Sequence, residues 1–171
     1  MGRIVVTEFV SLDGVMEAPG GGEDFRHGGW TFEIDRGENG DRFKLDELFE
    51  AEAQLLGRVT YEGFASAWPT MTDEVGFSEK MNAMPKYVVS STLKEADWNN
   101  STILSGDLTE EVTKLKQDVA GSAQLVRGLV AHDLLGTGKC LFGKAGDKKP
   151  LRLVGSKTVG AGVEILTYEP A

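Results

Sequence analysis

The feature that most constrains the fold is an alternation of short apolar runs with segments of helical periodicity. The first run, residues 4–10, is rich in β-branched residues and short enough to be a buried strand. A Gly-Ala-Gly turn at 160–162 separates the last two runs, which is the pattern of a β-hairpin. Strands that alternate with helices and end in a hairpin predict a mixed-sheet α/β domain. Besides the first run, strands are expected at 54–56, 86–90, 151–158 and 163–168.

Helices are predicted between these strands. In residues 41–53, Leu45, Leu48 and Phe49 share one face at spacings i, i+3 and i+4, and charged side chains occupy most other positions. A second helix is expected over 61–67, capped by Thr60. The remaining predictions are helices at 77–83 and 108–116, a weak strand at 117–120, and a helix that opens at Gly121-Ser122 and carries Leu125, Val126, Leu129 and Val130.

The length of 171 residues suits one domain, 1–171, with a core that needs no covalent or metal support. Residues 17–40 stand out as a long glycine-rich and acidic loop that contains Phe25, Trp30 and Phe32. Loops of that length in a compact domain are usually functional or disordered. The aromatic residues favour a loop that packs partly against the core.

Composition excludes several kinds of partner. The net charge of -9 argues against nucleic acid or an anionic membrane surface as the main partner, because both select basic proteins. A single cysteine, Cys140, rules out an intramolecular disulfide framework, and with two histidines it makes a zinc site improbable, so we expect no metal. No run of about 20 apolar residues is present, and we expect a cytoplasmic protein without a membrane partner.

Small or hydroxyl-bearing residues follow the predicted strand ends at 56–60, 89–92 and 120–123. In open α/β sheets, ligands bind beyond the carboxyl ends of the strands, and helix N-termini present N–H groups to anions. Such turns at neighbouring strands would bind a phosphorylated dinucleotide, and the planar guanidinium of Arg58 would bind a terminal phosphate through two N–H groups. The alternative is that Gly57 is a plain turn, Arg58 a surface ion pair, and Thr60 and Ser122 ordinary helix caps.

An ordered set of segments along the chain resembles the dihydrofolate-reductase-like family. The resemblance is greatest to the branch related to the C-terminal reductase domain of the bifunctional riboflavin-biosynthesis deaminase-reductase. It implies a dihydrofolate-reductase-like mixed sheet flanked by helices, NADPH as cofactor, a small-molecule substrate and a homodimer. The segments are TEFVSLDGV at 7–15, LLGRVTYE at 55–62, KYVVSSTL at 86–93, GSA at 121–123, GTGK at 136–139 and LFG at 141–143.

By position, the resemblance implies which residues would hold the cofactor. It assigns Gly57, Arg58 and Thr60 to the NADPH phosphates, and Ser90 and Ser91 to the region of the adenosine 2′-phosphate. It also assigns Gly121, Ser122 and Ala123 to the turn against the pyrophosphate.

Asp13 lies in the family's Ser-Leu-Asp-Gly segment, beside the nicotinamide and substrate, where its carboxylate would position a substrate amine or hydroxyl. The alternative for Asp13 is a turn cap before Gly14. Relatives have a further strand between their His-Asp-Leu and Gly-x-Gly segments. Here residues 131–134 run directly into 135–138, so one family strand is expected to be missing.

The sequence therefore predicts an NADPH-dependent oxidoreductase of the riboflavin and dihydrofolate reductase type. It would transfer a hydride to a small heterocyclic, carbonyl or imine substrate, similar to 5-amino-6-(5-phosphoribosylamino)uracil reductase. The alternative is a non-catalytic dinucleotide-binding or dimeric assembly module on the same scaffold.

Overall fold

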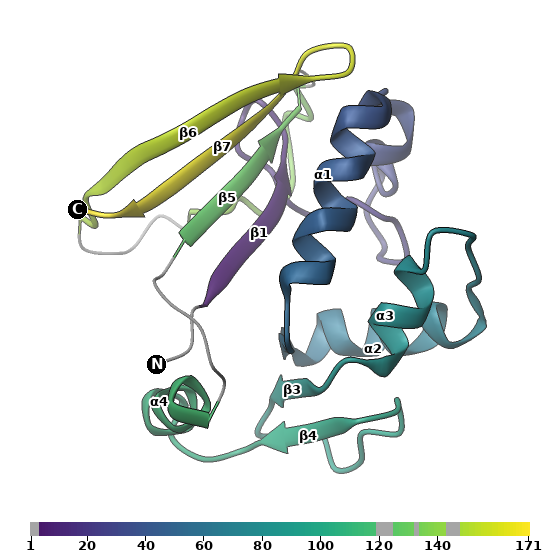
Figure 1. Ribbon diagram of the computed structural model, residues 1–171, viewed down its shortest axis with the longest axis vertical. Helices are drawn as coiled ribbons and strands as arrows, with labels where there is room; N and C mark the ends of the chain where they lie inside the picture. Colours follow the sequence, from purple (N-terminus) through teal and green to yellow (C-terminus); the bar gives the residue numbers. More distant parts are fainter. Residues whose placement is uncertain (1–3, 119–124, 132–133, 143–147) are drawn as a thin grey trace. The chain divides into compact units, whose positions relative to one another are not determined.

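The computed structural model describes residues 4–118, 125–131, 134–142 and 148–171. The chain divides into two compact units, shown with their helices and strands in Figure 1. The first unit comprises residues 42–120 with 1–2, and the second comprises 3–41 and 121–171. Within the described residues, no helix is both long and apolar enough to cross a bilayer.

A mixed sheet of four strands organises the second unit. Its order is β1 (Val5–Val10), β5 (Leu125–Val130), β7 (Val163–Pro170) and β6 (Leu151–Val159) (Figure 1). β1 and β5 are parallel, whereas β7 is antiparallel to both of its neighbours. β6 and β7 form the C-terminal hairpin that the glycine-rich turn predicted.

The turn of this hairpin requires glycine. Gly160 has φ +52°, and a Cβ there would lie 2.1 Å from the carbonyl oxygen of Asp35. The backbone N–H of Ala161 donates to that same oxygen at 2.9 Å. The hairpin is therefore tied to the loop that precedes α1.

β5 corrects the helix predicted to carry Leu125, Val126, Leu129 and Val130. Residues 125–130 form a strand that pairs with β1 along its whole length and with β7 from Val126 to Val130. A short apolar segment fits either structure, and Gly128 at its centre lowers the helix propensity. As a strand, the segment satisfies the backbone groups of β1 and β7, which would otherwise both be open edges.

No strand occurs in the described residues between β5 and β6, apart from one isolated bridge between Val15 and Cys140. The described part of this connection thus lacks a strand, as the shortened sequence predicted. β5 itself pairs directly with β7.

A parallel three-stranded sheet organises the first unit. Its order is β2 (Gln54–Gly57), β3 (Lys86–Val89) and β4 (Ser101–Leu104). The described strands thus form two sheets, one mixed and one parallel. β4 was not predicted, because its four residues, Ser-Thr-Ile-Leu, are too short to show a period.

The helices agree with the predictions except at their ends. They are α1 (Gly37–Glu50), α2 (Arg58–Ala67), α3 (Phe77–Ala83) and α4 (Leu108–Asp118), with short 3-10 turns η1 (Trp30–Glu33) and η2 (Trp68–Thr70). α1 begins four residues earlier than expected. Residues 117–118, predicted as the start of a weak strand, belong to α4, and residues 119–120 lie outside the described part.

Thr60 does not cap α2, contrary to the prediction. The helix begins at Arg58, the residue at its N-cap is Gly57, and no side chain caps it. Thr60 therefore lies inside the first turn. The physical reason is that Gly57 ends β2 with extended dihedrals, φ -77° and ψ 159°, so the chain enters the helix directly.

A buried lysine lies at the start of β3, next to the core formed by Tyr61, Met81, Met84, Val88 and Trp98. Lys86 is fully buried, and its Nζ donates to the carbonyl oxygens of Asn82 (2.7 Å), Met84 (2.9 Å) and Asn99 (3.0 Å). The ammonium also lies 4.1 Å from the centroid of the Trp98 ring. Burial lowers the pKa of Lys86. The side chain joins the end of α3 to the segment that leads into β4.

We expect Lys86→Met to destabilise the protein by about 2–4 kcal/mol, because it leaves buried carbonyl groups without a donor. The measurement is the midpoint of urea unfolding, with Lys94→Met as the control because Lys94 is exposed. Equal midpoints for the two variants would contradict a structural role for the Lys86 ammonium.

Candidate functional site

The carboxyl ends of the parallel strands meet at one edge of the first unit's sheet. Gly57 of β2 is paired with Val89 of β3, and Val89 with Leu104 of β4. Because the strands are parallel and in register, the segments that follow them start side by side. The structure therefore brings residues 57–60 and 90–91 to the same edge, although the sequence separates them by 30 residues or more.

The N-terminus of α2 lies at this edge. Gly57, Arg58 and Thr60 are all exposed, and a Cβ at Gly57 would meet no atom within 4 Å. The first N–H groups of a helix have no intrahelical acceptor, and here no side chain caps them. The backbone at Gly57 is open to close approach, and the helix dipole favours an anion there.

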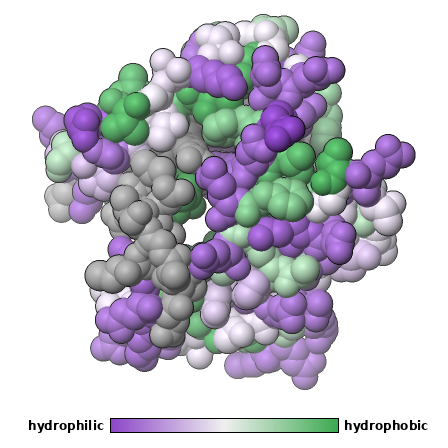
Figure 2. Space-filling model, viewed as in Figure 1, coloured by the Kyte–Doolittle hydropathy of each residue, from purple (hydrophilic) through white to green (hydrophobic). Residues whose placement is uncertain are grey.

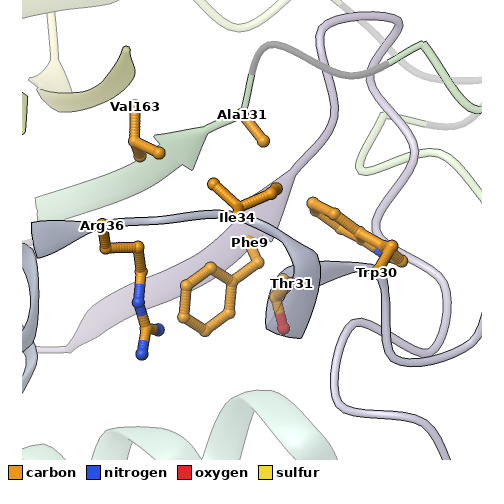
Figure 3. Close-up of a pocket in the computed structure, with 7 residues that line it drawn as sticks. All are labelled: Phe9, Trp30, Thr31, Ile34, Arg36, Ala131 and Val163. Atoms are coloured by element: carbon orange, nitrogen blue, oxygen red, sulfur yellow. The ribbon is translucent and has the colours of Figure 1, made fainter. Parts of the chain in front are cut away.

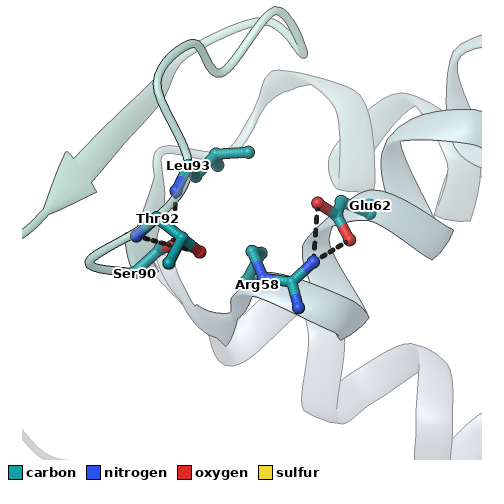
Figure 4. A network of polar contacts seen from close by, with 5 residues as sticks. All are labelled: Arg58, Glu62, Ser90, Thr92 and Leu93. Atoms are coloured by element: carbon teal, nitrogen blue, oxygen red, sulfur yellow. Dashed lines mark hydrogen bonds and ion pairs between the residues drawn. The ribbon is translucent and has the colours of Figure 1, made fainter.

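Arg58 makes an ion pair with Glu62, one turn further along α2 (Figure 4). Its Nη1 donates to both carboxylate oxygens of Glu62, at 2.8 and 3.0 Å. Both side chains are nearly half exposed. Exposed pairs of this kind contribute little to stability, so another anion can replace the Glu62 carboxylate on Arg58.

Ser90 shapes the turn after β3 (Figure 4). Its Oγ accepts the backbone N–H groups of Thr92 (3.2 Å) and Leu93 (2.9 Å), and its own N–H donates to Leu104 at 3.1 Å. The residue is only 8% exposed, whereas Ser91 is exposed. Of the two serines, Ser91 is therefore the one whose hydroxyl is accessible to a ligand.

An open groove of about 410 Å³ runs along the first unit between α2 and the segment after β3. The rings of Tyr61 and Trp98, both almost fully buried, line it. Glu62, Glu95 and Asp97 supply carboxylates, and none of the described residues that line the groove is basic. We call it the acidic groove.

The predicted pyrophosphate turn, Gly121, Ser122 and Ala123, lies outside the described residues.

Asp13 lies in the second unit, just beyond the end of β1. Its carboxylate accepts three hydrogen bonds, from the Ser11 hydroxyl (2.6 Å) and the backbone N–H groups of Gly136 (2.7 Å) and Leu135 (3.3 Å). The Ser11 hydroxyl and the Gly136 N–H, in that order, lower the pKa of Asp13. Asp13 is therefore an anion at neutral pH. It accepts hydrogen bonds and is not a proton donor.

These bonds join two loops that are far apart in the sequence. The N–H of Met16 donates to Lys139 at 2.8 Å, and that of Leu141 donates to Gly14 at 3.0 Å. Gly138 has φ +123°, and a Cβ there would lie 2.5 Å from a Val15 methyl group. The sequence showed two turns, one around Asp13-Gly14 and one at 136–138, but held no signal of their pairing.

The long loop at 17–40 is partly packed, as its aromatic residues predicted. Trp30 is 3% exposed, and its Nε1 donates to the carbonyl oxygen of Glu17 at 3.1 Å. Trp30 borders a cavity of about 10 Å³, which has room for a water molecule at most (Figure 3). Figure 3 also shows the guanidinium of Arg36 beside the Phe9 ring, 5.3 Å from its centroid. This cavity is a packing feature of the second unit and is too small for a substrate.

Comparison with known proteins gives a family and a fold. The family described as the RibD C-terminal domain matches residues 3–165. The chain is 28% identical over 187 residues to the uncharacterized protein YyaP of Bacillus subtilis (strain 168), covering 97% of this chain and 94% of the relative.

Solved structures support the same fold. A putative riboflavin biosynthesis protein from Shewanella sp. PV-4 has a TM-score of 0.72 at 18% identity, covering 100% of this chain and 99% of that one. The diaminohydroxyphosphoribosylaminopyrimidine deaminase/5-amino-6-(5-phosphoribosylamino)uracil reductase of Thermotoga maritima has a TM-score of 0.58 at 14% identity, covering 99% and 57%. Dihydrofolate reductase from Enterococcus faecalis, complexed with NADP(H) and RAB-propyl, has a TM-score of 0.50 at 12% identity, covering 99% and 96%. The fold is dihydrofolate-reductase-like.

The Asp13 contacts predict a local effect of substitution. In Asp13→Asn, an amide N–H₂ group competes for positions that now accept backbone N–H groups, so the amide of Gly136 should exchange with solvent faster. The Met16 amide, bonded to Lys139, is the internal control. Hydrogen exchange measured by NMR reports both.

The same contacts predict a pH dependence. The pKa of Asp13 is lower in the folded than in the unfolded protein, so its stabilising effect is complete above the ordinary pKa of 3.8. It is lost as the pH falls through the lowered value. For the substitution, an unchanged exchange rate of the Gly136 amide in Asp13→Asn would contradict the hydrogen bond from this amide to the Asp13 carboxylate.

Proposed function

The chain belongs to the RibD C-terminal domain family, and on this premise we propose that it is an NADPH-dependent reductase of a small heterocyclic, carbonyl or imine substrate. The observation that carries the proposal is the in-register pairing of β2 with β3, which sets an uncapped helix N-terminus beside a hydroxyl-bearing turn. The activity in the name of the Thermotoga protein, reduction of 5-amino-6-(5-phosphoribosylamino)uracil, indicates the kind of substrate.

The residues at this edge fit a phosphorylated dinucleotide. Gly57 leaves the backbone accessible, the first N–H groups of α2 could donate to an anion, and the planar guanidinium of Arg58 could bind a phosphate through two N–H groups. We assign Thr60 and Ser91 as hydroxyl donors to further phosphate oxygens, and Ser90 as the residue that shapes the turn. Gly121, Ser122 and Ala123 keep the pyrophosphate role that the resemblance implies. The bound coenzyme would supply the hydride, and the protein would supply binding and orientation.

We assign Asp13 as the residue that positions the substrate. An ionised carboxylate has about four lone-pair sites, of which its three hydrogen bonds use three. One site remains for an amine or hydroxyl of the substrate. Because the pKa of Asp13 is lowered, the proton that completes a reduction comes from another group or from water.

We further propose that residues 1–171 act as one reductase domain and that the protein is a homodimer. Support for a dimer comes from β6, an edge strand whose residues are all exposed except Val159. Leu151, Leu153 and Val154 are among its exposed side chains. By contrast, much of the face in Figure 2 is hydrophilic, with hydrophobic residues in separate patches.

Arg58→Ala should weaken NADPH binding by about tenfold or more, since hydrogen bonds to charged groups are worth about 1.5–3 kcal/mol. Binding of NADH, which lacks the 2′-phosphate, should change much less. Titration followed by nucleotide fluorescence measures both constants. Arg42→Ala is the matched control, because Arg42 forms a similar exposed i,i+4 pair with Asp46 on α1.

Two results would count against the proposal. If neither nucleotide binds the wild-type protein, the alternative of an assembly module without nucleotide binding is favoured. If both arginine variants lose the same affinity, the phosphate does not bind at the β2–β3 edge.

A further inference from the structure

Arg58 occupies an electrostatically unfavourable position. It is the first residue of α2, where the helix dipole is positive and favours an anion over a cation. The order of the pair, with the cation toward the N-terminus and Glu62 four residues later, is the less favourable one for an i,i+4 pair. The guanidinium and the uncapped N–H groups thus concentrate positive charge at one point.

The Glu62 carboxylate supplies a negative charge beside the positively charged start of α2. Across the described part of the chain, its carboxylate is the one group paired with the Arg58 guanidinium, and Nη1 donates to both of its oxygens (Figure 4). No side chain in the described part of the first unit caps α2. In the protein without ligand, the Glu62 carboxylate therefore occupies the position on Arg58 that a phosphate would take.

The acidic groove makes this arrangement selective. Glu62 lines the groove together with Glu95 and Asp97, and neither of these two makes an ion pair or hydrogen bond with another described residue. When Glu62 leaves Arg58, its charge stays in a groove that two other carboxylates line and that no described basic residue lines. Like charges repel, so displacing Glu62 requires an anion that binds Arg58 strongly.

We propose that Glu62 is a specificity-determining residue that acts as a resident anion on Arg58 and is displaced by the 2′-phosphate of NADPH. This inference rests on the proposed function and goes beyond it, because it assigns the discrimination between the two coenzymes to a pair of residues. A dianionic phosphate replaces the carboxylate on the guanidinium. The neutral 2′-hydroxyl of NADH does not, and with NADH the Arg58–Glu62 pair stays closed.

Glu62→Gln tests the inference, since it removes the competing charge and keeps the side-chain shape. NADPH should bind the variant about two- to fivefold more tightly than it binds the wild type, in keeping with the small strength of exposed ion pairs. NADH affinity should stay within about twofold. The readout is the binding constant of each nucleotide, from fluorescence titration, rather than turnover.

Glu95→Gln is the matched control. It removes one negative charge from the same groove, but Glu95 does not contact Arg58. We expect it to raise NADPH affinity by less than Glu62→Gln does, because it relieves only part of the repulsion that a displaced Glu62 carboxylate meets and leaves the Arg58–Glu62 pair intact. An equal gain from both variants would overturn the inference, because the effect would then be general electrostatic attraction.

Failure of the inference is distinguishable from failure of the proposed function. If Arg58→Ala weakens NADPH binding but Glu62→Gln leaves it unchanged or weaker, Glu62 is not a competitor and the inference is wrong, while the phosphate site stands. If the wild-type protein binds neither nucleotide, both are wrong.

Discussion

The candidate nucleotide site depends on the parallel, in-register pairing of β2 with β3. This pairing sets Gly57 beside Val89, so that α2 and the turn at Ser90 begin at the same edge of the sheet. A shift of one residue would send the side chains of one strand to the opposite face and separate these segments. The fully buried Lys86 lies at the other end of β3, where it binds the carbonyl groups that precede and follow the strand. The strand that carries the turn is thus fixed at its start by a buried charge.

The two units contribute different chemistry. The first unit concentrates positive potential at the start of α2, and the second holds an anionic Asp13 in a set of backbone N–H groups. Each feature is built from loops adjoining strands, where functional residues are most often found. In both cases a carboxylate accepts the hydrogen bonds: Glu62 accepts from the Arg58 guanidinium, and Asp13 accepts from the Gly136 N–H. The difference is that Glu62 is held by one side chain, whereas Asp13 is held by a side chain and two backbone groups.

Periodicity and turn residues predicted much of the fold. The predictions that were wrong or missing have identifiable physical causes. The hairpin was predictable because Gly160 and Gly162 interrupt two alternating runs. Residues 125–130 were not, because a short apolar run suits a helix or a central strand and only its neighbours β1 and β7 decide. The roles proposed for residues 57–60 and 90–91 came from the strand-end pattern and the family resemblance, but the hydrogen bonds of Ser90 to Thr92 and Leu93 needed coordinates. The contact of Asp13 with Gly136 also needed coordinates, since no local sequence pattern predicts pairing between distant loops.

The most direct test of the central claim is an NMR titration of the ¹⁵N-labelled protein with NADPH. We predict that the backbone amides of residues 58–60 and 90–93 shift together and saturate at the same nucleotide concentration, as they must if both segments bind one molecule. The claim would be contradicted if the two segments saturated at different concentrations, or if NADPH shifted other amides and left these unchanged.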